Sequence, residues 1–175
     1  MKSPVDVLKE EHLLLKQAIT TTTQLQEIND NELYHSKLQD MILFFRNFTE
    51  LYHDPKETNI LYPILQAKNS NNTTSELQDI CHHSEDLELM IADIIDDYVA
   101  YDMRNLRKSV ARYLEELSMQ IEQEENILDN AWNLLSEAES DMIYKEFVQH
   151  DEKDRLMGAI KKNFYKISNQ ISINN

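Results

Sequence analysis

The chain has 175 residues, of which 41% are hydrophobic and only 1 is glycine and 3 are proline, a composition that fits one compact, helix-rich domain. Its formal net charge of −15 disfavours binding to nucleic acid and to anionic membrane surfaces. No run approaches the roughly 20 apolar residues that span a bilayer, and the first residues, MKSPVDVLKEEH, lack the apolar core of a signal peptide. We therefore expect a cytoplasmic protein with no nucleic-acid or membrane partner.

Apolar residues recur with helical spacing in four long segments. The first helix is expected to begin after Ser3, a favourable N-cap, with Pro4 in its first turn. The second is expected to start near Asp30. The polar stretch NSNNTTSELQ at residues 69–78 is predicted to hold a loop followed by the start of the third helix, with Thr73 and Glu76 as its capping box. YDMRN at residues 101–105 precedes the fourth helix.

Long helices with short connections predict an all-α protein, an antiparallel up-down four-helix bundle. The bundle is expected to occupy residues 1–136. A break follows near Ser136, and residues 137–175 carry further amphipathic patterns. We therefore expect one or two additional C-terminal helices that pack on the outside of the bundle.

Polar side chains interrupt the apolar stripe of every predicted helix of the bundle. They are imidazoles, carboxylates and one amide, in this order along the chain: His12, His53, Glu57, His83, Gln120 and Glu124. Taken alone, His12 would be a hydrogen-bonded core histidine, and Glu124 would be a solvated member of the acidic segment IEQEEN. Their coincidence on four helices favours a metal site instead, because a cation compensates carboxylates that are buried without another partner.

The available side chains limit which metal can bind. Cys81 is the single cysteine, which excludes a thiolate cluster, and imidazole with carboxylate suits iron, manganese or zinc. His53 and Glu57 are four positions apart, on one helix face and about 6 Å from each other, so they can bind one cation or bridge two. Pro55 lies between them and is expected to kink or widen the helix. The residues therefore predict a transition-metal pair inside the bundle.

Other histidines and acids are weaker candidates. His82 lies about 100° around the helix from His83 and is expected at the surface or behind the ligands, whereas Asp79 lies one turn before His83. Asp79 would supply a further ligand, as would His82 if the helix were rotated. His35 and His150 are expected to be exposed.

At these residues the chain resembles hemerythrin-like (HHE cation-binding) domains. HDPKETNILYPIL at residues 53–65 is similar to the helix-2 signature of the family, with its His-x-x-x-Glu and the following Leu-aromatic-Pro. QIEQEENILDNAWNLL at residues 120–135 is similar to the helix-4 signature, and the likeness extends over about residues 5–150. The resemblance implies a non-heme di-iron centre whose ligand positions are His12, His53, Glu57, His83 and Glu124.

One ligand position departs from the family pattern. Gln120 stands where the family has histidine, and its amide oxygen binds iron more weakly than an imidazole does. In the family arrangement the histidines of helices 1 and 2 serve one iron and those of helices 3 and 4 the other. We therefore expect one tightly bound and one weakly bound iron.

The resemblance implies binding or sensing of O2, NO or peroxide, or the handling of iron. Neither a Ser or Cys nucleophile with a paired base nor a Gly-rich phosphate loop is evident, which disfavours hydrolytic and nucleotide-dependent enzymes. A peroxidase-like side activity stays open. The alternatives are a ferritin-like carboxylate di-metal protein, suggested by the Glu-x-x-His of Glu50 and His53, and a metal-depleted bundle that serves as an interaction module, for which Gln120 is the best argument.

Overall fold

The structure is a computed structural model that describes residues 2–68, 71–131, 133–153 and 156–172, without the side chains of residues 71–74, 131, 153 and 171–172. These ranges hold helices and connections and no strand. The elements are α1 (Pro4–Gln26), α2 (Asn31–Phe45), η1 (Arg46–His53), α3 (Asp54–Lys56), η2 (Glu57–Leu61), α4 (Tyr62–Lys68), α5 (Asn71–Val99), α6 (Met103–Ala131), α7 (Glu137–Lys153) and α8 (Met157–Ser172).

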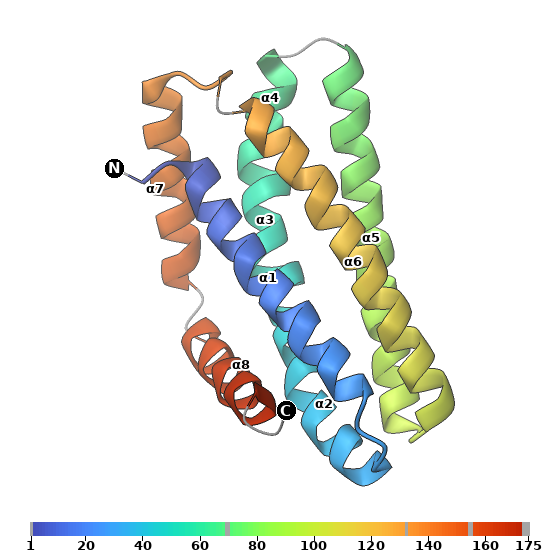
Figure 1. Ribbon diagram of the computed structural model, residues 1–175. Helices are drawn as coiled ribbons and strands as arrows, with labels where there is room; N and C mark the ends of the chain where they lie inside the picture. Colours follow the sequence, from blue (N-terminus) through green and yellow to red (C-terminus); the bar gives the residue numbers. More distant parts are fainter. Residues whose placement is uncertain (1, 69–70, 132, 154–155, 173–175) are drawn as a thin grey trace.

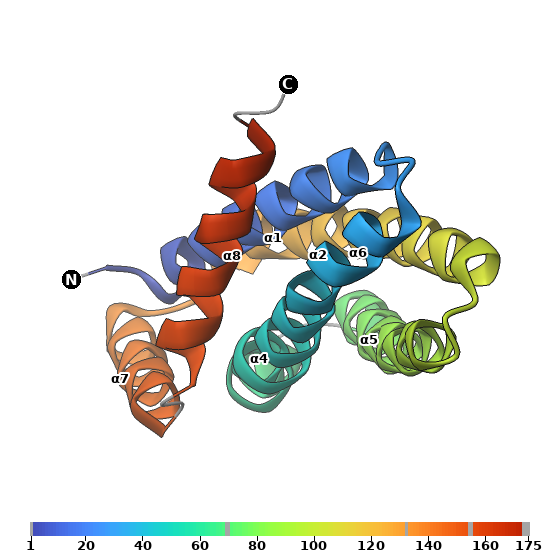
Figure 2. The same cartoon turned by 90° about the horizontal axis from the view of Figure 1, so that it is seen from below.

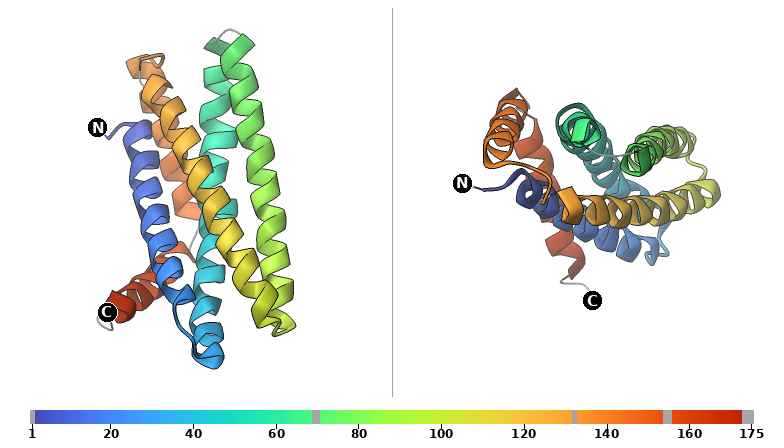
Figure 3. Two further views of the ribbon diagram at one scale, coloured as in Figure 1. Left: turned by 45° about the vertical axis from the view of Figure 1, so that its right-hand side comes forward. Right: turned by 90° about the horizontal axis from the view of Figure 1, so that it is seen from above.

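Four antiparallel rods form the body of the molecule (Figures 1 and 3). α1 runs in one direction, the continuous rod from α2 to α4 returns, α5 runs parallel to α1, and α6 returns beside α5 and α1 (Figure 1). This arrangement confirms the predicted all-α, up-down four-helix bundle. Across the described part of the chain, no helix combines the length and the apolar character needed to cross a membrane.

The starts of the first two helices follow the sequence prediction. The Ser3 hydroxyl accepts a hydrogen bond from the Asp6 N–H, and the Asp6 carboxylate accepts one from the Ser3 N–H, which is a capping box with Pro4 at the first helical position. Asp30 caps α2 in the same way by accepting from the N–H groups of the first turn. These caps satisfy backbone donors that a helix end leaves without partners.

The third helix begins slightly earlier in the structure than the sequence predicts. α5 begins at Asn71, so Thr73 lies inside the helix and the prediction of Thr73 as its N-cap was wrong. The first turns of this helix are polar along their whole length, so they carry no apolar periodicity from which its start could be predicted.

The rod from α2 to α4 widens on both sides of Pro55. η1 and η2 are π-helical, so backbone N–H groups bond to the carbonyl five residues back, as Tyr62 does to Glu57. Pro55 has no N–H to donate to the carbonyl of Leu51, which disfavours an undisturbed α-helical ladder. The expected widening is therefore present, and π-helical turns of this kind are frequent at functional sites.

Two apolar clusters fill the bundle, and a polar layer separates them. The cluster nearer the connection between α1 and α2 includes Leu15, Phe48, Leu87, Leu117 and Ile121. The cluster at the opposite end includes Leu8, Leu61, Ile80, Ile127 and Leu128. The buried polar side chains between them are His12, His53, Glu57, Ser84, Gln120 and Glu124.

The expected C-terminal helices are present and share the core of the bundle. α7 packs against α1 and η2, and α8 packs against α1, α2 and η1. Ile143 and Phe147 of α7 belong to the second apolar cluster, whereas Phe164 and Ile167 of α8 belong to the first. Figure 2 shows α8 lying across α1 and α2.

Candidate metal centre

Four buried side chains in the polar layer point their ligand atoms at one another. His12, His53, Glu57 and Glu124 each offer one nitrogen or oxygen, and these atoms all lie within 4.8 Å of one another. The Nε2 atom of His12 lies 3.1 Å from Nε2 of His53, 3.2 Å from Oε2 of Glu124 and 3.7 Å from Oε1 of Glu57. The group therefore joins three rods of the bundle around one point.

Each of these side chains is placed by its helix. His12 stands between Leu8 and Leu15 on the buried face of α1, so the apolar contacts above and below fix its direction. His53 ends η1 and Glu57 begins η2, so the widened turns on either side of Pro55 carry both ligands. Glu124 lies on the buried face of α6, the face that packs against α1 and α5.

The other ring nitrogen of His53 bonds to a residue that the sequence reasoning missed. Nδ1 of His53 lies 2.9 Å from Oε2 of Glu11, and Oε1 of Glu11 lies 2.5 Å from Nζ of Lys56. Lys56 is fully buried, which is rare for lysine. The sequence signals are faint: Glu11 directly precedes His12 and Lys56 directly precedes Glu57, and charged residues beside candidate ligands are by themselves typical of solvated positions.

The two carboxylates of the group have further hydrogen-bond partners. The hydroxyl of Tyr62 donates to Oε2 of Glu57 at 2.6 Å. The amide nitrogen of Gln120 donates to Oε1 of Glu124 at 2.7 Å and to the hydroxyl of Ser84 at 2.8 Å. Gln120 thus lies beside the group and orients one of its carboxylates through its nitrogen.

Burial and mutual charge strongly perturb the ionisation of the group. Burial, together with the nearby Glu124 carboxylate, raises the pKa of Glu57 to about 7, and burial also raises the pKa of Glu124. Burial and the charge of His53 lower the pKa of His12 to about 4. Burial alone would lower the pKa of His53, but its hydrogen bond to Glu11 and the charge of Glu57 outweigh this and raise it to about 10. Burial therefore disfavours charge on His12, Glu57 and Glu124, whereas Glu11 and Glu57 favour the protonated form of His53.

The donor set and its spacing fit a first-row transition metal. Ligand bonds of about 2.0–2.2 Å around one ion place donor atoms within about 4.4 Å of one another, and the distances from Nε2 of His12 fall inside that limit. Among the described residues, Oε1 of Glu57 and Oε1 of Gln120 are buried without a hydrogen-bond partner. Two such oxygens in a buried layer favour a cation that would complete their coordination.

The structure does not bring every candidate ligand to this group. His83 is partly exposed, and its Nε2 lies 3.2 Å from Oε2 of Glu116, while the neighbouring Ser84 takes the buried position on α5. His82 is exposed beside Glu85.

Four further residues named from the sequence also lie outside the group. Asp79 is exposed, and Glu50 lies 3.9 Å from Arg46. The expectation that His35 is exposed was wrong, because its ring stacks on Tyr98 with centroids 3.8 Å apart. His150 is likewise only partly exposed.

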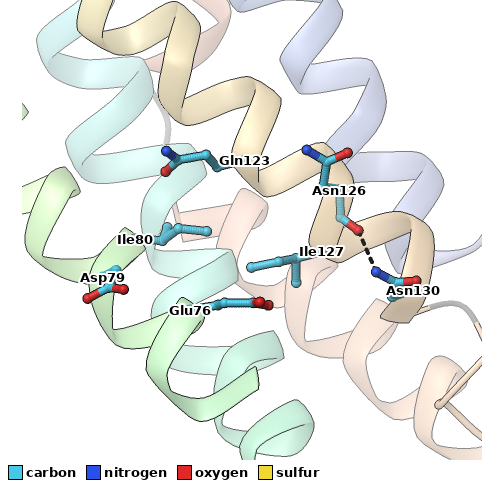
Figure 4. Close-up of a pocket in the computed structure, with 7 residues that line it drawn as sticks. All are labelled: Glu76, Asp79, Ile80, Gln123, Asn126, Ile127 and Asn130. Carbon is cyan, nitrogen blue, oxygen red and sulfur yellow. Dashed lines mark hydrogen bonds between the residues drawn. The ribbon is translucent and has the colours of Figure 1, made fainter. Parts of the chain in front are cut away.

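A pocket of about 400 Å³ lies in the groove between α5 and α6 (Figure 4). Glu76, Asp79 and Ile80 line it from α5, and Gln123, Asn126, Ile127 and Asn130 line it from α6. The four residues of the His/Glu group are not among its lining residues. This pocket is a surface feature that leaves the group enclosed.

No curated protein and no solved structure was found to match the chain. The model of the hemerythrin HHE cation binding domain matches residues 3–132, which include all four residues of the group and end before α7. This match, over most of the chain and with a buried His/Glu group at its centre, shows that the chain belongs to the hemerythrin HHE cation-binding family.

Proposed function

We propose that this chain is a hemerythrin-like non-heme iron protein in which His12, His53, Glu57 and Glu124 bind the first iron. The observation that carries the proposal is the convergence of two imidazoles and two carboxylates at one buried point. The contact between His53 and Glu11 adds support, because a metal-binding histidine commonly donates a hydrogen bond from its other ring N–H to a carboxylate. Iron, rather than manganese or zinc, is proposed from membership of the family.

A second iron would have fewer ligands from this chain. It would share the carboxylates of Glu57 and Glu124 with the first iron. The buried oxygen Oε1 of Gln120 lies beside them and is available as a further metal ligand. His83, the other candidate, bonds to Glu116 away from the group. We therefore propose a di-iron centre with unequal positions, in which the second iron is held weakly and keeps more room for an exogenous ligand.

The enclosure of the centre supports a small ligand. His12, His53, Glu57 and Glu124 are buried, and apolar clusters close the polar layer on both sides. When bound, a non-heme iron pair supplies one-electron chemistry toward O2, NO or peroxide. The proposed function is accordingly the binding or sensing of such a molecule, or the handling of iron itself, with any enzymatic activity secondary.

Metal content of the purified protein tests this proposal. We expect about two iron ions per chain after anaerobic reconstitution, with near-ultraviolet absorption from ferric iron after exposure to air. His53→Ala should lose most of the iron, whereas the matched control His82→Ala should keep it, because His82 is exposed on α5. Chains that stay free of iron after reconstitution would instead support a metal-depleted interaction module.

The same experiment separates the ferritin-like alternative. That alternative needs Glu50 as a ligand, but Glu50 lies near Arg46 and outside the His/Glu group. Glu50→Ala should therefore retain iron at the level of the unmodified chain. Loss of iron in Glu50→Ala comparable with the loss in His53→Ala would favour the ferritin-like arrangement.

A further inference from the structure

A buried chain of charges connects α7 to His53. Oδ1 of Asp151 lies 2.5 Å from Nζ of Lys56, the same ammonium lies 2.5 Å from Oε1 of Glu11, and Oε2 of Glu11 lies 2.9 Å from Nδ1 of His53. Asp151 belongs to α7, Lys56 to α3, Glu11 to α1 and His53 to η1. Three parts of the sequence that are far apart, namely α1, the consecutive elements η1 and α3, and α7, thus meet in one line of contacts.

Lys56 lies at the centre of these charged contacts, between Asp151 and Glu11. Its side chain is fully buried, and its ammonium lies 3.7 Å from the centroid of the Tyr52 ring. Removing an ammonium from water is costly unless charges and hydrogen bonds replace the lost hydration. Glu11 and Asp151 supply the two opposite charges, and the face of Tyr52 supplies a cation–π contact. Lys56 is therefore held in one place.

Glu11 links the ammonium of Lys56 to the imidazole of His53 and so fixes the orientation of that metal ligand. One of its oxygens is taken by Lys56 and the other by Nδ1 of His53, so neither is free to turn away. A hydrogen bond at Nδ1 keeps a proton on that nitrogen and directs Nε2 toward the centre of the group. Nε2 of His53 does lie there, 3.1 Å from Nε2 of His12.

α7 is docked in a way that brings Asp151 to Lys56. Phe147, one turn before Asp151, is buried in the second apolar cluster, and its ring centroid lies 5.9 Å from Nζ of Lys56. α7 also packs along α1 and η2, as Figure 1 shows for α1. At Asp151, the outer residue of the charged contacts, the site opens on a pocket of about 380 Å³ whose lining includes Glu11 and Asp151. Solvent can therefore approach Asp151 while Lys56 stays covered.

We propose that Glu11, Lys56 and Asp151 are positioning residues for the metal ligand His53, and that α7 thereby completes a metal centre whose family match ends at residue 132. This inference rests on the proposed metal-binding function. α7, which follows the matched domain, would then take a direct part in the site. The carboxylate of Asp151 on this helix holds Lys56, and Lys56 in turn holds Glu11, which orients the imidazole of His53.

Two isosteric substitutions test the proposal in the full-length chain. Glu11→Gln removes the charge that holds both His53 and Lys56, and Asp151→Asn removes the outer charge alone. The matched controls are Glu10→Gln, at the neighbouring exposed position of α1, and Glu146→Gln, at an exposed position of α7. Asp151 is partly exposed, so its amide variant is expected to fold; Lys56→Met is avoided because it would leave two carboxylates without their cation.

The first readout needs no metal. In the metal-free protein, a slowly exchanging, downfield proton on Nδ1 of His53 is expected by nuclear magnetic resonance, because this proton is buried and bonded to Glu11. The signal should be lost or moved upfield in Glu11→Gln and should exchange faster in Asp151→Asn. Both control variants should resemble the unmodified chain. A signal that is absent from the unmodified chain, or that neither substitution changes, would overturn the proposal.

The second readout is a titration with Co²⁺ alone, followed by its visible absorption. Loss of an outer partner of a ligating histidine typically reduces metal affinity by about 10–100-fold, which is the decrease expected for Glu11→Gln. Asp151→Asn should give a smaller decrease in affinity, and the controls none. Affinities of both variants equal to those of their controls would overturn the proposal. A chain that shows the predicted Nδ1 signals and binds neither Co²⁺ nor iron would refute the proposed metal function and leave the positioning of His53 supported.

Discussion

The Nε2 atoms of His12 and His53 lie 3.1 Å apart, although the two residues are 41 positions apart in the sequence. One is held on the buried face of α1, the other at the end of the π-helical turn η1. The carboxylates of Glu57 and Glu124 lie beside them in a layer that is apolar above and below. Such a layer holds more ionisable groups than its own hydrogen bonds can satisfy, so stability of the metal-free protein and capacity for metal are expected to oppose each other.

Glu57→Gln should reveal this opposition. Burial and the neighbouring Glu124 carboxylate disfavour the charge on Glu57, and the amide of glutamine removes that charge while it can still accept a hydrogen bond from Tyr62. We expect the metal-free variant to melt several degrees above the metal-free unmodified chain near pH 8, and to bind iron far more weakly. Calorimetry and metal analysis measure the two effects. Glu122→Gln, at an exposed position of the same helix, is the control, and a metal-free Glu57→Gln that melts lower would contradict the account.

Chelation should lower the melting temperature of the iron-loaded protein. A ligand that binds only the folded state stabilises it by about 2.7 kcal/mol at a free concentration of 100 times Kd. For a chain of this length that corresponds to roughly 5–10 °C. Differential scanning calorimetry before and after chelation gives the shift. His53→Ala, which lacks a ligand, should show almost none, and an unchanged melting temperature of the unmodified chain would refute the expectation.

The helices and most of the converging residues could be predicted because both depend on local periodicity. His12 and Glu124 occupy positions of an apolar stripe, so the phase of the helix directs them inward. His83 shows the limit of this reasoning. Positions three and four residues after Ile80 border the same stripe, and the structure buries Ser84 there while His83 contacts Glu116. Helix phase alone does not decide between two adjacent positions at the edge of a stripe.

The buried charge chain lay beyond prediction for a different reason. Glu11 and Lys56 are charged residues beside ligands, and local pattern alone assigns such residues to solvent. Their burial depends on Asp151, which comes from a helix packed across the bundle. Local periodicity predicts that α7 is helical, but it carries no information on which residue of the bundle its carboxylates meet.

Alkaline pH should destabilise the protein partly through Tyr34. Burial raises the pKa of Tyr34 to about 12, although the nearby charge of Arg107 works in the opposite direction. Between pH 10 and that value the unfolded chain loses the phenol proton first, so the unfolded state binds fewer protons and the free energy of unfolding falls as pH rises. The contribution of this one group reaches at most about 3 kcal/mol, from two pKa units at about 1.4 kcal/mol each.

Tyr34→Phe tests this contribution. Among the described residues, the hydroxyl of Tyr34 has no hydrogen-bond partner, so its removal should leave stability at pH 8 unchanged or slightly higher. Arg107 still has an aromatic face to pack on, 3.9 Å from its guanidinium carbon in the unmodified chain. Urea unfolding at pH 8 and pH 11 should show a smaller loss of stability in the variant. Tyr165→Phe, at an exposed tyrosine, should lose as much stability between pH 8 and pH 11 as the unmodified chain does. Equal losses of stability in both variants and the unmodified chain would contradict the contribution assigned to Tyr34.

Gln120→His should strengthen the weaker of the two proposed iron positions. The glutamine uses its nitrogen to hold Ser84 and Glu124, and its buried oxygen is the donor left for a second metal. An imidazole at this position would supply the nitrogen ligand found in the family pattern. Because changes to outer partners alone shift metal affinity by about 10–100-fold, the second affinity should rise by at least about tenfold and the absorption spectrum should change.

Stepwise iron titration under anaerobic conditions distinguishes the two positions. The unmodified chain should bind one iron tightly and one weakly, and Gln120→His should bring the two affinities closer by improving the second. The variant should also lose some metal-free stability, about 1 kcal/mol for each hydrogen bond to Ser84 and Glu124 that it cannot replace. Gln123→His, an exposed position on the same helix, adds a histidine without reaching the centre and should leave both steps unchanged. Two equal affinities in the unmodified chain, unaltered by Gln120→His, would show that another side chain serves the second iron.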